Sequence, residues 1–307
     1  MDLRERVVFI TGGARGIGAA VGIEAGRRGA KVALAGLEPE LLAAAAARIG
    51  PEALHVRCDV TDMASVEAAV ASAVERFGGI DVVLANAGIG TYGTVEAGDA
   101  DAWLRTIDVN LNGAYRTVKA TLPHVAERRG YIGIVCSIAS FAPLAAMSSY
   151  SASKAGTESL VRAVRQEVGF RGVDVGAIHP SWIDTDLVRE SDLDLPSFRV
   201  SRARLPWPLR ATTSVSDCAV AIVDGFERRR ARVFVPRAAA LTYWLRTLIT
   251  SGLAERVLLA GSAERIPQIE HEIAALGRSA SVRTATINDL GGDVDAAAAA
   301  SEGRASR

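Results

Sequence analysis

Cysteine is scarce in this chain, and so is histidine. The three cysteines among its 307 residues are Cys58, Cys136 and Cys218. No Cys-x-x-Cys pair is present, so the sequence predicts buried, reduced thiols in a cytosolic protein instead of a disulfide framework. The four histidines are His55, His124, His179 and His271. They show neither metal-ligand spacing nor a Ser-His-Asp order, so we expect no metal centre and no hydrolytic triad.

Net charge is absent as well, because 35 basic residues balance 35 acidic ones. This balance offers no general electrostatic attraction for nucleic acid. Long hydrophobic runs are also missing. The apolar stretch 238–249 is too short to span a bilayer and contains Arg246. The N-terminal residues show no basic segment followed by an apolar core, so we expect no secretory signal and a cytoplasmic location.

Short β-rich runs alternate with helical patterns through most of the chain. Strands are predicted at 6–11, 31–36, 53–58, 81–85, 131–136, 173–178 and 232–235. Most of these runs are continuously apolar, which is typical of parallel strands covered on both faces. After Asp62, a plausible N-cap, valines 66, 70 and 74 recur at helical spacing. The alternation predicts an α/β fold with a doubly wound parallel sheet of about seven strands.

The sequence divides into one α/β domain over 1–236, a helical extension over 237–278 and a tail over 279–307. Residues 186–213 follow the sixth strand and are either a substrate loop or an ordinary surface excursion, because ligands bind beyond the carboxyl ends of such strands. Helices are predicted at 238–251 and 263–277. This extension covers the active-site cleft, packs on a partner subunit or lies on a membrane surface. The tail is rich in Ala, Gly and Ser, and we expect disorder there.

A glycine-rich loop, Thr11-Gly-Gly-Ala-Arg-Gly-Ile-Gly18, follows the first predicted strand and opens a helix. Glycines at these positions allow a tight turn and a close approach of the backbone to a pyrophosphate at the positive end of the helix. The loop therefore indicates a nucleotide cofactor.

Tyr150 and Lys154 lie four residues apart in Tyr-Ser-Ala-Ser-Lys, so a helix places them on one face. A phenol has a pKa of about 10, and a neighbouring ammonium lowers it. Ser137 ends the fifth predicted strand, where its hydroxyl can bind and polarise a substrate oxygen. Cys136 beside it is expected to face the core. A Tyr-x-x-x-Lys pair alone is usually a surface contact, but after a nucleotide loop it indicates hydride transfer at a carbon that bears oxygen.

These motifs, together with Asp59, Asn86-Ala-Gly88, Asn110 and Pro180-Ser-Trp-Ile-Asp-Thr185, resemble the short-chain dehydrogenase/reductase family over about residues 5–236. The resemblance implies an NAD(P)-dependent oxidoreductase with a Rossmann-like fold. The catalytic residues that it implies are Asn110, Ser137, Tyr150 and Lys154. The cofactor-binding residues that it implies are Gly12, Arg15, Gly16, Ile17, Gly18, Asp59, Val60, Asn86, Ala87, Gly88, Tyr150, Lys154, Pro180, Ile183 and Thr185.

The resemblance also implies a role for individual residues. Tyr150 is the general acid or base, Lys154 hydrogen-bonds the nicotinamide ribose, and Asn110 supports a water that links Lys154 to solvent. Asp59 contacts the adenine, while Ile183 and Thr185 hold the carboxamide and phosphates. The family usually has Pro-Gly where this chain has Pro180-Ser181, which puts the local backbone shape in question. A homodimer or homotetramer is implied, with helices around 99–127 and 149–169 at one interface.

The choice between NAD and NADP depends on charge near the end of the second strand. An acidic residue there would bind the adenosine ribose and repel a 2′-phosphate. Gly36 and then Leu37 occupy this position, whereas Arg15 could pair with the phosphate. Glu38 is close enough in sequence to complicate the choice, and Arg15 also occurs in family members that use NAD. We favour NADP and leave NAD open.

The sequence thus predicts an enzyme that interconverts a ketone or aldehyde with an alcohol. An apolar substrate is expected, because the region of 186–213 is surrounded by Trp182, Leu187, Leu193, Leu195, Phe198, Trp207 and Leu209. Two alternatives remain. The chain could be a non-catalytic NADP(H)-binding regulatory protein, or a membrane-peripheral reductase that reaches lipid-like substrates through residues 238–277.

Overall fold

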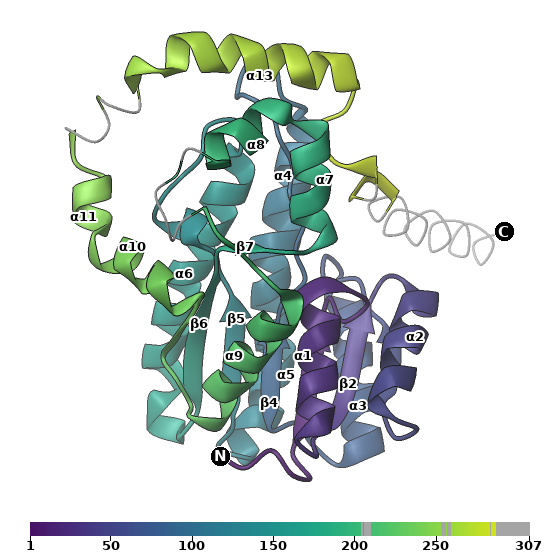
Figure 1. Cartoon of the computed structure of the whole chain (residues 1–307). Helices are drawn as coiled ribbons and strands as arrows, with labels where there is room; N and C mark the ends of the chain where they lie inside the picture. Colours follow the sequence, from purple (N-terminus) through teal and green to yellow (C-terminus); the bar gives the residue numbers. More distant parts are fainter. Residues whose placement is uncertain (204, 206–209, 253–255, 257–258, 283, 287–307) are drawn as a thin grey trace, which may run out of the picture.

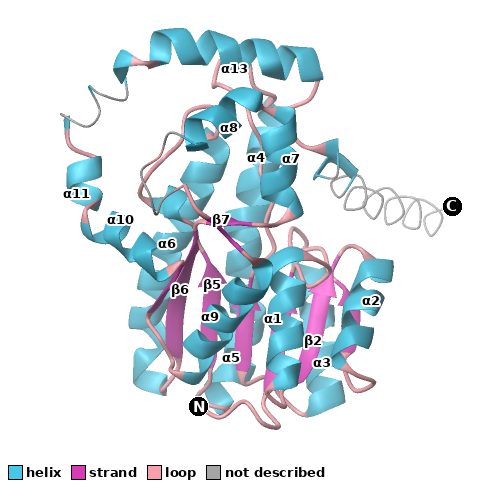
Figure 2. Ribbon diagram, viewed as in Figure 1, coloured by secondary structure: helices cyan, strands magenta, loops and turns pink. Residues whose placement is uncertain are grey.

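A seven-stranded parallel sheet forms the centre of the computed structural model, which describes residues 1–203, 205, 210–252, 256, 259–282 and 284–286 (Figures 1 and 2). The strand order is β3-β2-β1-β4-β5-β6-β9. Their bounds are Val7–Thr11 for β1, Lys31–Gly36 for β2, Leu54–Arg57 for β3, Val82–Ala85 for β4, Tyr131–Val135 for β5, Asp174–Pro180 for β6 and Arg232–Val235 for β9. All seven predicted strands are confirmed, with ends within two residues of those expected.

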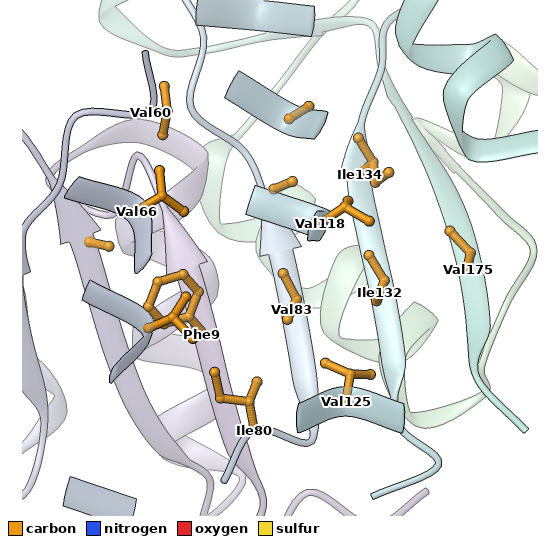
Figure 3. Close-up of a cluster of buried hydrophobic side chains, with 14 of the residues drawn as sticks. Phe9, Val60, Val66, Ile80, Val83, Val118, Val125, Ile132, Ile134 and Val175 are labelled. Atoms are coloured by element: carbon orange, nitrogen blue, oxygen red, sulfur yellow. The ribbon is translucent and has the colours of Figure 1, made fainter. Parts of the chain in front are cut away.

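Helices cover both faces of the sheet, so that the predicted doubly wound α/β fold is confirmed. One face carries α1 (Gly16–Arg27), α2 (Pro39–Ile49) and α9 (Val215–Glu227). The other carries α3 (Met63–Phe77), α5 (Gly113–Glu127) and α6 (Ser148–Val168). Buried valines and isoleucines fill the space between sheet and helices (Figure 3). Strands that are apolar on both faces are buried on both faces, which is why their sequences do not alternate.

Helix α3 shows how local sequence sets an element's limits. The Asp62 carboxylate accepts hydrogen bonds from the backbone N–H groups of Ala64 (3.0 Å) and Ser65 (3.1 Å). These bonds satisfy N–H groups that have no partner inside the helix, so the predicted N-cap is confirmed. The helix ends at Gly78, which has the left-handed φ of +76° that favours glycine.

The region after β6 forms a second layer beyond the carboxyl ends of the strands (Figure 1). It contains the strand pair β7 (Trp182–Ile183) and β8 (Thr212–Thr213), with helices α7 (Asp186–Asp194) and α8 (Pro196–Ala203) between them. On the same side, α4 (Ala100–Ile107) leads through a π-helical turn at Asp108–Asn112 into α5. The predicted insertion at 186–213 is thus largely helical, and its Trp207 and Leu209 lie outside the described residues.

The C-terminal extension packs onto this second layer. Helix α13 (Ser262–Leu276) corresponds to the helix predicted at 263–277, and its Ile273 is buried against Tyr92 and Leu195. The single helix predicted at 238–251 is instead divided into a 3₁₀ turn at Arg237–Ala239, α10 (Ala240–Trp244) and α11 (Arg246–Ile249). The Arg246 guanidinium donates to the Tyr243 carbonyl (2.8 Å), which satisfies a carbonyl at the break between the two short helices.

Contacts continue beyond residue 278, which corrects the expected start of disorder at 279. The backbone N–H of Tyr92 donates to the Ser279 carbonyl (2.8 Å), and Thr91 forms an antiparallel bridge with Ala280. Ser281 and Thr284 are buried, because this segment packs beside the loop after β4. Residues 287–307, the rest of the predicted tail, lie outside the described residues. None of the helices that the structure describes is both long and apolar enough to span a bilayer.

Candidate active site

A cleft of about 250 Å³ lies at the carboxyl ends of the central strands and collects most of the predicted cofactor-binding residues. Those that line it are Gly12, Arg15, Gly16, Ile17, Asp59, Val60, Asn86, Ala87, Gly88, Tyr150, Lys154, Pro180, Ile183 and Thr185. They come from the segments after β1, β3 and β4, from the end of β6 and the segment after it, and from α6. A parallel sheet brings these carboxyl ends to one edge, which is where α/β proteins bind ligands.

The glycine loop has a shape that suits a dinucleotide. Gly12 has a φ of +66°, and a Cβ there would fall 2.8 Å from both the Ala87 Cα and the Asn86 Nδ2. The Asn86 amide donates to the carbonyls of Thr11 and Gly12 (3.1 Å each) and holds the loop against the end of β4. A Cβ on Gly18 would lie 2.2 Å from the Gly12 carbonyl oxygen. Glycine alone allows this packing, and the loop fits the pyrophosphate of a nicotinamide cofactor at the positive end of α1.

Arg15 and Glu38 form an ion pair at the edge of this cleft, and both side chains line it. The Arg15 Nε donates to Glu38 Oε2 at 2.9 Å, and a second guanidinium nitrogen pairs with Oε1. Sequence reasoning singled out Arg15 as a partner for a 2′-phosphate and treated Glu38 only as a complication. In the structure, Glu38 lies two residues after the end of β2. Its carboxylate lines the cleft and forms an ion pair with the Arg15 guanidinium.

Asp59 lies at the adenosine side of the cleft, after β3. Its Oδ1 accepts hydrogen bonds from the Thr61 N–H (2.8 Å) and hydroxyl (2.7 Å), and Arg105 approaches Oδ2 at 3.8 Å. These bonds hold the carboxylate in one orientation. They also satisfy a charged group that is almost fully buried. Asp59 lines the cleft, and its contact with the adenine stays a prediction of the family resemblance.

Helix α6 carries Tyr150 and Lys154 on one face, as predicted. The Lys154 Nζ lies 5.7 Å from the centre of the Tyr150 ring and donates a hydrogen bond to the Val135 carbonyl (2.8 Å). Burial lowers the pKa of Lys154 from its usual 10.5 to about 8. The amine therefore loses its proton far more readily than an exposed lysine would.

The pKa of Tyr150 is raised, contrary to the predicted lowering. Burial is the largest cause, a hydrogen bond to the Ser137 side chain acts in the opposite direction, and the neighbouring Cys136 adds to the rise. Spacing along a helix predicts that Lys154 is near, but not that the phenol is desolvated. The phenol therefore keeps its proton in this environment.

Ser137 lies just past the end of β5 with an extended backbone. Its hydroxyl accepts from the Ala139 N–H (3.2 Å), while its own N–H donates to Ser140 Oγ (3.3 Å). Ser140 in turn donates to the backbone carbonyl of Lys154 (2.9 Å), so the serine loop is tied to α6. Cys136 is fully buried in the core, as predicted. Tyr150 and Lys154 line the cleft, and Ser137 contacts Tyr150 without lining the cleft itself.

Asn110 is buried in the π-helical turn and does not line the cleft. Its Oδ1 accepts from the Ile89 N–H (2.8 Å), and its Nδ2 donates to the Ile89 carbonyl (3.0 Å) and to Ser153 Oγ (3.1 Å). The side chain therefore anchors the chain just after Gly88 to the helix that carries Lys154. π-helical turns are rare in proteins, and many of those that occur lie at functional sites. This one directs Asn110 inward.

The segment after β6 also reaches the cleft as predicted. The Ser181 N–H donates to the Val235 carbonyl (2.8 Å), and Thr185 stands at the N-cap position of α7 without a side-chain capping bond. Non-glycine residues with positive φ in the described part of the chain are Glu5, Arg129, Ala146 and Arg229. Ser181 has no left-handed backbone, so a serine fits where the family usually has glycine.

Several lining residues were missed in the sequence. They are Ile89, Ser181, Val188, Glu190 and Thr284. Thr284 comes from the segment expected to be disordered, and no local pattern marks it, because its place depends on how the C-terminal segment packs beside the loop after β4.

The family model for short chain dehydrogenases matches residues 6–195, well over half of the chain. The chain belongs to the short-chain dehydrogenase/reductase family. It is similar to trans-4-hydroxycyclohexanecarboxylate dehydrogenase of Sinomonas cyclohexanicum, with 37% identity over 60% of this chain and 74% of the relative. It is also 36% identical to L-rhamnose 1-dehydrogenase (NAD(P)(+)) of Azotobacter vinelandii, over 67% and 84% of the two chains. This member of the family is accordingly an oxidoreductase that acts on CH–OH donors.

Solved structures agree with this assignment. Levodione reductase superimposes with a TM-score of 0.68 at 28% identity, covering 76% of this chain and 96% of the reductase. A family member from Burkholderia phymatum, determined in complex with NAD, gives a TM-score of 0.70 at 22% identity over 81% and 95% of the two chains. At that identity the second likeness concerns the fold alone. The matched family region ends before α8, so the C-terminal extension lies outside it.

Proposed function

We propose that this dehydrogenase interconverts a ketone or aldehyde and an alcohol, with Tyr150 as the general acid or base. The observation that supports this best is that Tyr150 and Lys154 both line the cleft that begins at the glycine loop, while the Ser137 side chain hydrogen-bonds Tyr150. A bound nicotinamide supplies or accepts the hydride. In the direction of reduction, Ser137 orients the carbonyl oxygen and Tyr150 donates its proton to that oxygen.

The protonation states of the two side chains suit this division of roles. Burial keeps the proton on the Tyr150 phenol, which is the form needed to protonate a carbonyl oxygen. In the direction of oxidation the phenol must first lose that proton, and a protonated Lys154 nearby stabilises the phenolate. The pKa of about 8 at Lys154 lets the amine change its charge close to neutral pH.

Tyr150→Phe tests this assignment. The variant keeps the ring and loses the proton, so turnover across a panel of ketones and aldehydes falls by about 10²-fold or more. Cofactor affinity, measured by fluorescence titration, stays near that of the wild type. The competing regulatory function predicts a wild type that binds the cofactor and turns over no member of the panel, which would refute the catalytic assignment.

For the cofactor, the Arg15–Glu38 pair supports NAD over the NADP that Arg15 alone suggested. The Glu38 carboxylate would accept hydrogen bonds from the adenosine ribose hydroxyls and repel a 2′-phosphate. It also occupies the guanidinium that would otherwise be available to that phosphate. We propose NAD as the preferred cofactor.

An apolar carbonyl substrate is proposed from the lining of the cleft near α7. Ile89, Leu187 and Val188 supply apolar walls there, and Glu190 and Thr284 supply polar groups. Cyclic ketones and aliphatic aldehydes should show lower KM values than sugar-like carbonyls of equal size. Turnover restricted to hydrophilic members of the panel would contradict this proposal.

A second candidate, contact with an anionic membrane surface, is favoured by an exposed apolar stripe on α10 and α11. Leu241, Trp244, Leu245 and Leu248 recur at helical spacing and are 41–73% exposed. The segment 237–252 contains two arginines and no acidic residue. Flotation with vesicles rich in anionic lipid should recover the wild type and lose Trp244→Ser. If the wild type did not float with these vesicles, the proposed membrane contact would be wrong.

We also propose a homo-oligomer in which α4, α5 and α6 form one interface. Trp103, Leu104 and Tyr115 are large apolar side chains that stay 37–60% exposed on α4 and α5. Light scattering of the purified chain tests this, and a monomer at micromolar concentration would exclude it.

A further inference from the structure

A buried cluster of ionisable side chains lies directly behind Ser137, outside the cleft. It joins three strands or helices that are far apart in sequence. His179 near the end of β6 is fully buried, with its Nε2 at 3.1 Å from Glu158 Oε2. Glu158 stands one helical turn after Lys154 on α6, and Arg232 at the start of β9 approaches its Oε1 at 3.0 Å.

His179 contacts the backbone of Ser137 through its other ring nitrogen. His179 Nδ1 lies 3.3 Å from the backbone carbonyl oxygen of Ser137. A carbonyl oxygen only accepts hydrogen bonds, so Nδ1 carries the proton in this contact. The Glu158 carboxylate attracts the ring at Nε2 only when that nitrogen carries a proton too, which makes the ring an imidazolium. The bond from Nδ1 restrains the backbone of Ser137, which lies just past the end of β5. The Ser140 hydroxyl, bonded to the Ser137 N–H, holds the same residue from the α6 side.

Aromatic rings fix the plane of the imidazole. Phe234 stacks on His179 with ring centres 4.9 Å apart and an angle of 17°, and Phe141 lies 5.3 Å away at a tilt. Tyr243, from α10 of the C-terminal extension, contacts both phenylalanines at 5.7 Å. The Arg232 guanidinium lies 4.5 Å from the centre of the Tyr243 ring. Tyr243 therefore packs over the cluster and connects it with the extension.

A metal centre is the other function that this cluster could have. Cys136, Glu158 and His179 place possible ligand atoms within 4.8 Å of one another. However, Arg232 already pairs with Glu158, and burial strongly raises the pKa of the Cys136 thiol. A thiol binds metal as the thiolate, and a neighbouring guanidinium opposes a second cation. The cluster thus suits side-chain positioning better than metal binding.

We propose that His179 is a positioning residue that holds Ser137 for catalysis, that Glu158 and Arg232 hold His179, and that Tyr243 of the C-terminal extension completes its packing. This inference rests on the proposed role of Ser137. It gives the extension a function in the reaction although none of these four side chains lines the cleft.

Two substitutions at His179 separate positioning from simple packing. In His179→Asn the side-chain amide Nδ2 can replace Nδ1 as the donor to Ser137, whereas His179→Leu has no donor. We expect kcat to fall about 10- to 100-fold in His179→Leu, the effect of losing one buried hydrogen bond, with the cofactor Kd unchanged. His179→Asn should restore most of that loss. Equal kcat values in the two variants, high or low, would overturn the proposal.

The protonation of the His179 ring can be measured by NMR whether or not the enzyme turns over a substrate. ¹⁵N NMR of histidine-labelled wild type should show a proton on Nδ1 of His179, identified by comparison with His179→Asn. If the wild type turned over no carbonyl, the proposed function would fail while a protonated Nδ1 still supported the contact with Ser137. A ring protonated only on Nε2 would refute the positioning role itself.

The contribution of the extension is tested at Tyr243. Tyr243→Ala removes the ring that packs on Phe141 and Phe234, and kcat should fall about 2- to 10-fold, as for one or two aromatic contacts. Tyr243→Phe keeps the ring and should retain wild-type kcat. Phe170→Ala, which changes an aromatic side chain that is 87% exposed in the 3₁₀ turn Gly169–Arg171 after α6, is the matched control. If Tyr243→Ala matched that control, the extension would have no part in positioning.

Discussion

Replacement of Glu38 by glutamine is the most direct test of how this enzyme selects its cofactor. The Glu38 and Arg15 side chains are 16% and 29% exposed, and both line the cleft. Glu38→Gln removes the negative charge and keeps the size of the side chain. It also frees the Arg15 guanidinium from its charged partner. Both changes favour a cofactor that carries a 2′-phosphate.

The size of the effect follows from the charges. Two unit charges about 4 Å apart at an effective dielectric constant of about 20 interact by about 4 kcal/mol. Arg15 neutralises much of the Glu38 charge and the site is partly exposed, so about 1–2 kcal/mol of this repulsion remains. The ratio of the NADPH Kd to the NADH Kd should therefore fall about 5- to 30-fold in Glu38→Gln.

Fluorescence titration with NADH and NADPH measures this ratio. The control is Glu40→Gln, which removes an exposed carboxylate from the first turn of α2, two residues away and outside the cleft. It should leave the ratio unchanged and so exclude a general effect of net charge. A wild type that binds NADPH more tightly than NADH, or an equal ratio in Glu38→Gln and wild type, would refute the reasoning.

Three further predictions concern cofactor fit, pH and the extension. Gly18→Ala places a Cβ 2.2 Å from the Gly12 carbonyl oxygen and should abolish NADH binding in calorimetry, whereas Gly169→Ala, with open space around it, should bind normally. The folded-state pKa of Lys154 is about 8 instead of 10.5, so the folded chain binds fewer protons between these values and stability rises with pH. Urea unfolding at pH 8 and pH 10 should give a change in stability that is more positive in wild type than in Lys154→Met, by at most about 3 kcal/mol, because the buried tyrosines and cysteines titrate alike in both. Arg278→Ala removes two hydrogen bonds to Asp194, at 2.7 and 3.1 Å, and should speed proteolysis after α13, while an unchanged rate would show that this pair does not hold the extension.

Local patterns in the sequence carry information about the sheet and the reactive pair because their physical causes are local. A run of apolar residues such as 31–36 is buried on both faces wherever it pairs, so its length and position follow from composition. The four-residue spacing of Tyr150 and Lys154 sets their shared face on any helix. The glycine loop is recognisable because close backbone packing at Gly12 and Gly18 admits no side chain.

Contacts between residues far apart in sequence decide the features that local patterns did not predict. Apolar, helix-forming residues at 238–251 suggest one helix, yet the Arg246 side chain bonds the Tyr243 carbonyl and the helix is divided. Nothing near Thr284 in sequence indicates that it reaches the cleft, because that placement depends on contacts of Ser279 and Ala280 with the loop after β4. The role of Glu38 depends on the direction of one side chain toward Arg15, twenty-three residues earlier in the chain.

The amino-acid sequence by itself therefore determined the order of strands and helices, the glycine-rich loop and the shared helix face of Tyr150 and Lys154, since each depends on residues within one or two turns. Only the tertiary structure decided the protonation of Tyr150, the pairing of Glu38 with Arg15 and the packing of Tyr243 behind Ser137. Charge states and ring contacts depend on which distant groups exclude water from a site, and folding alone brings those groups together.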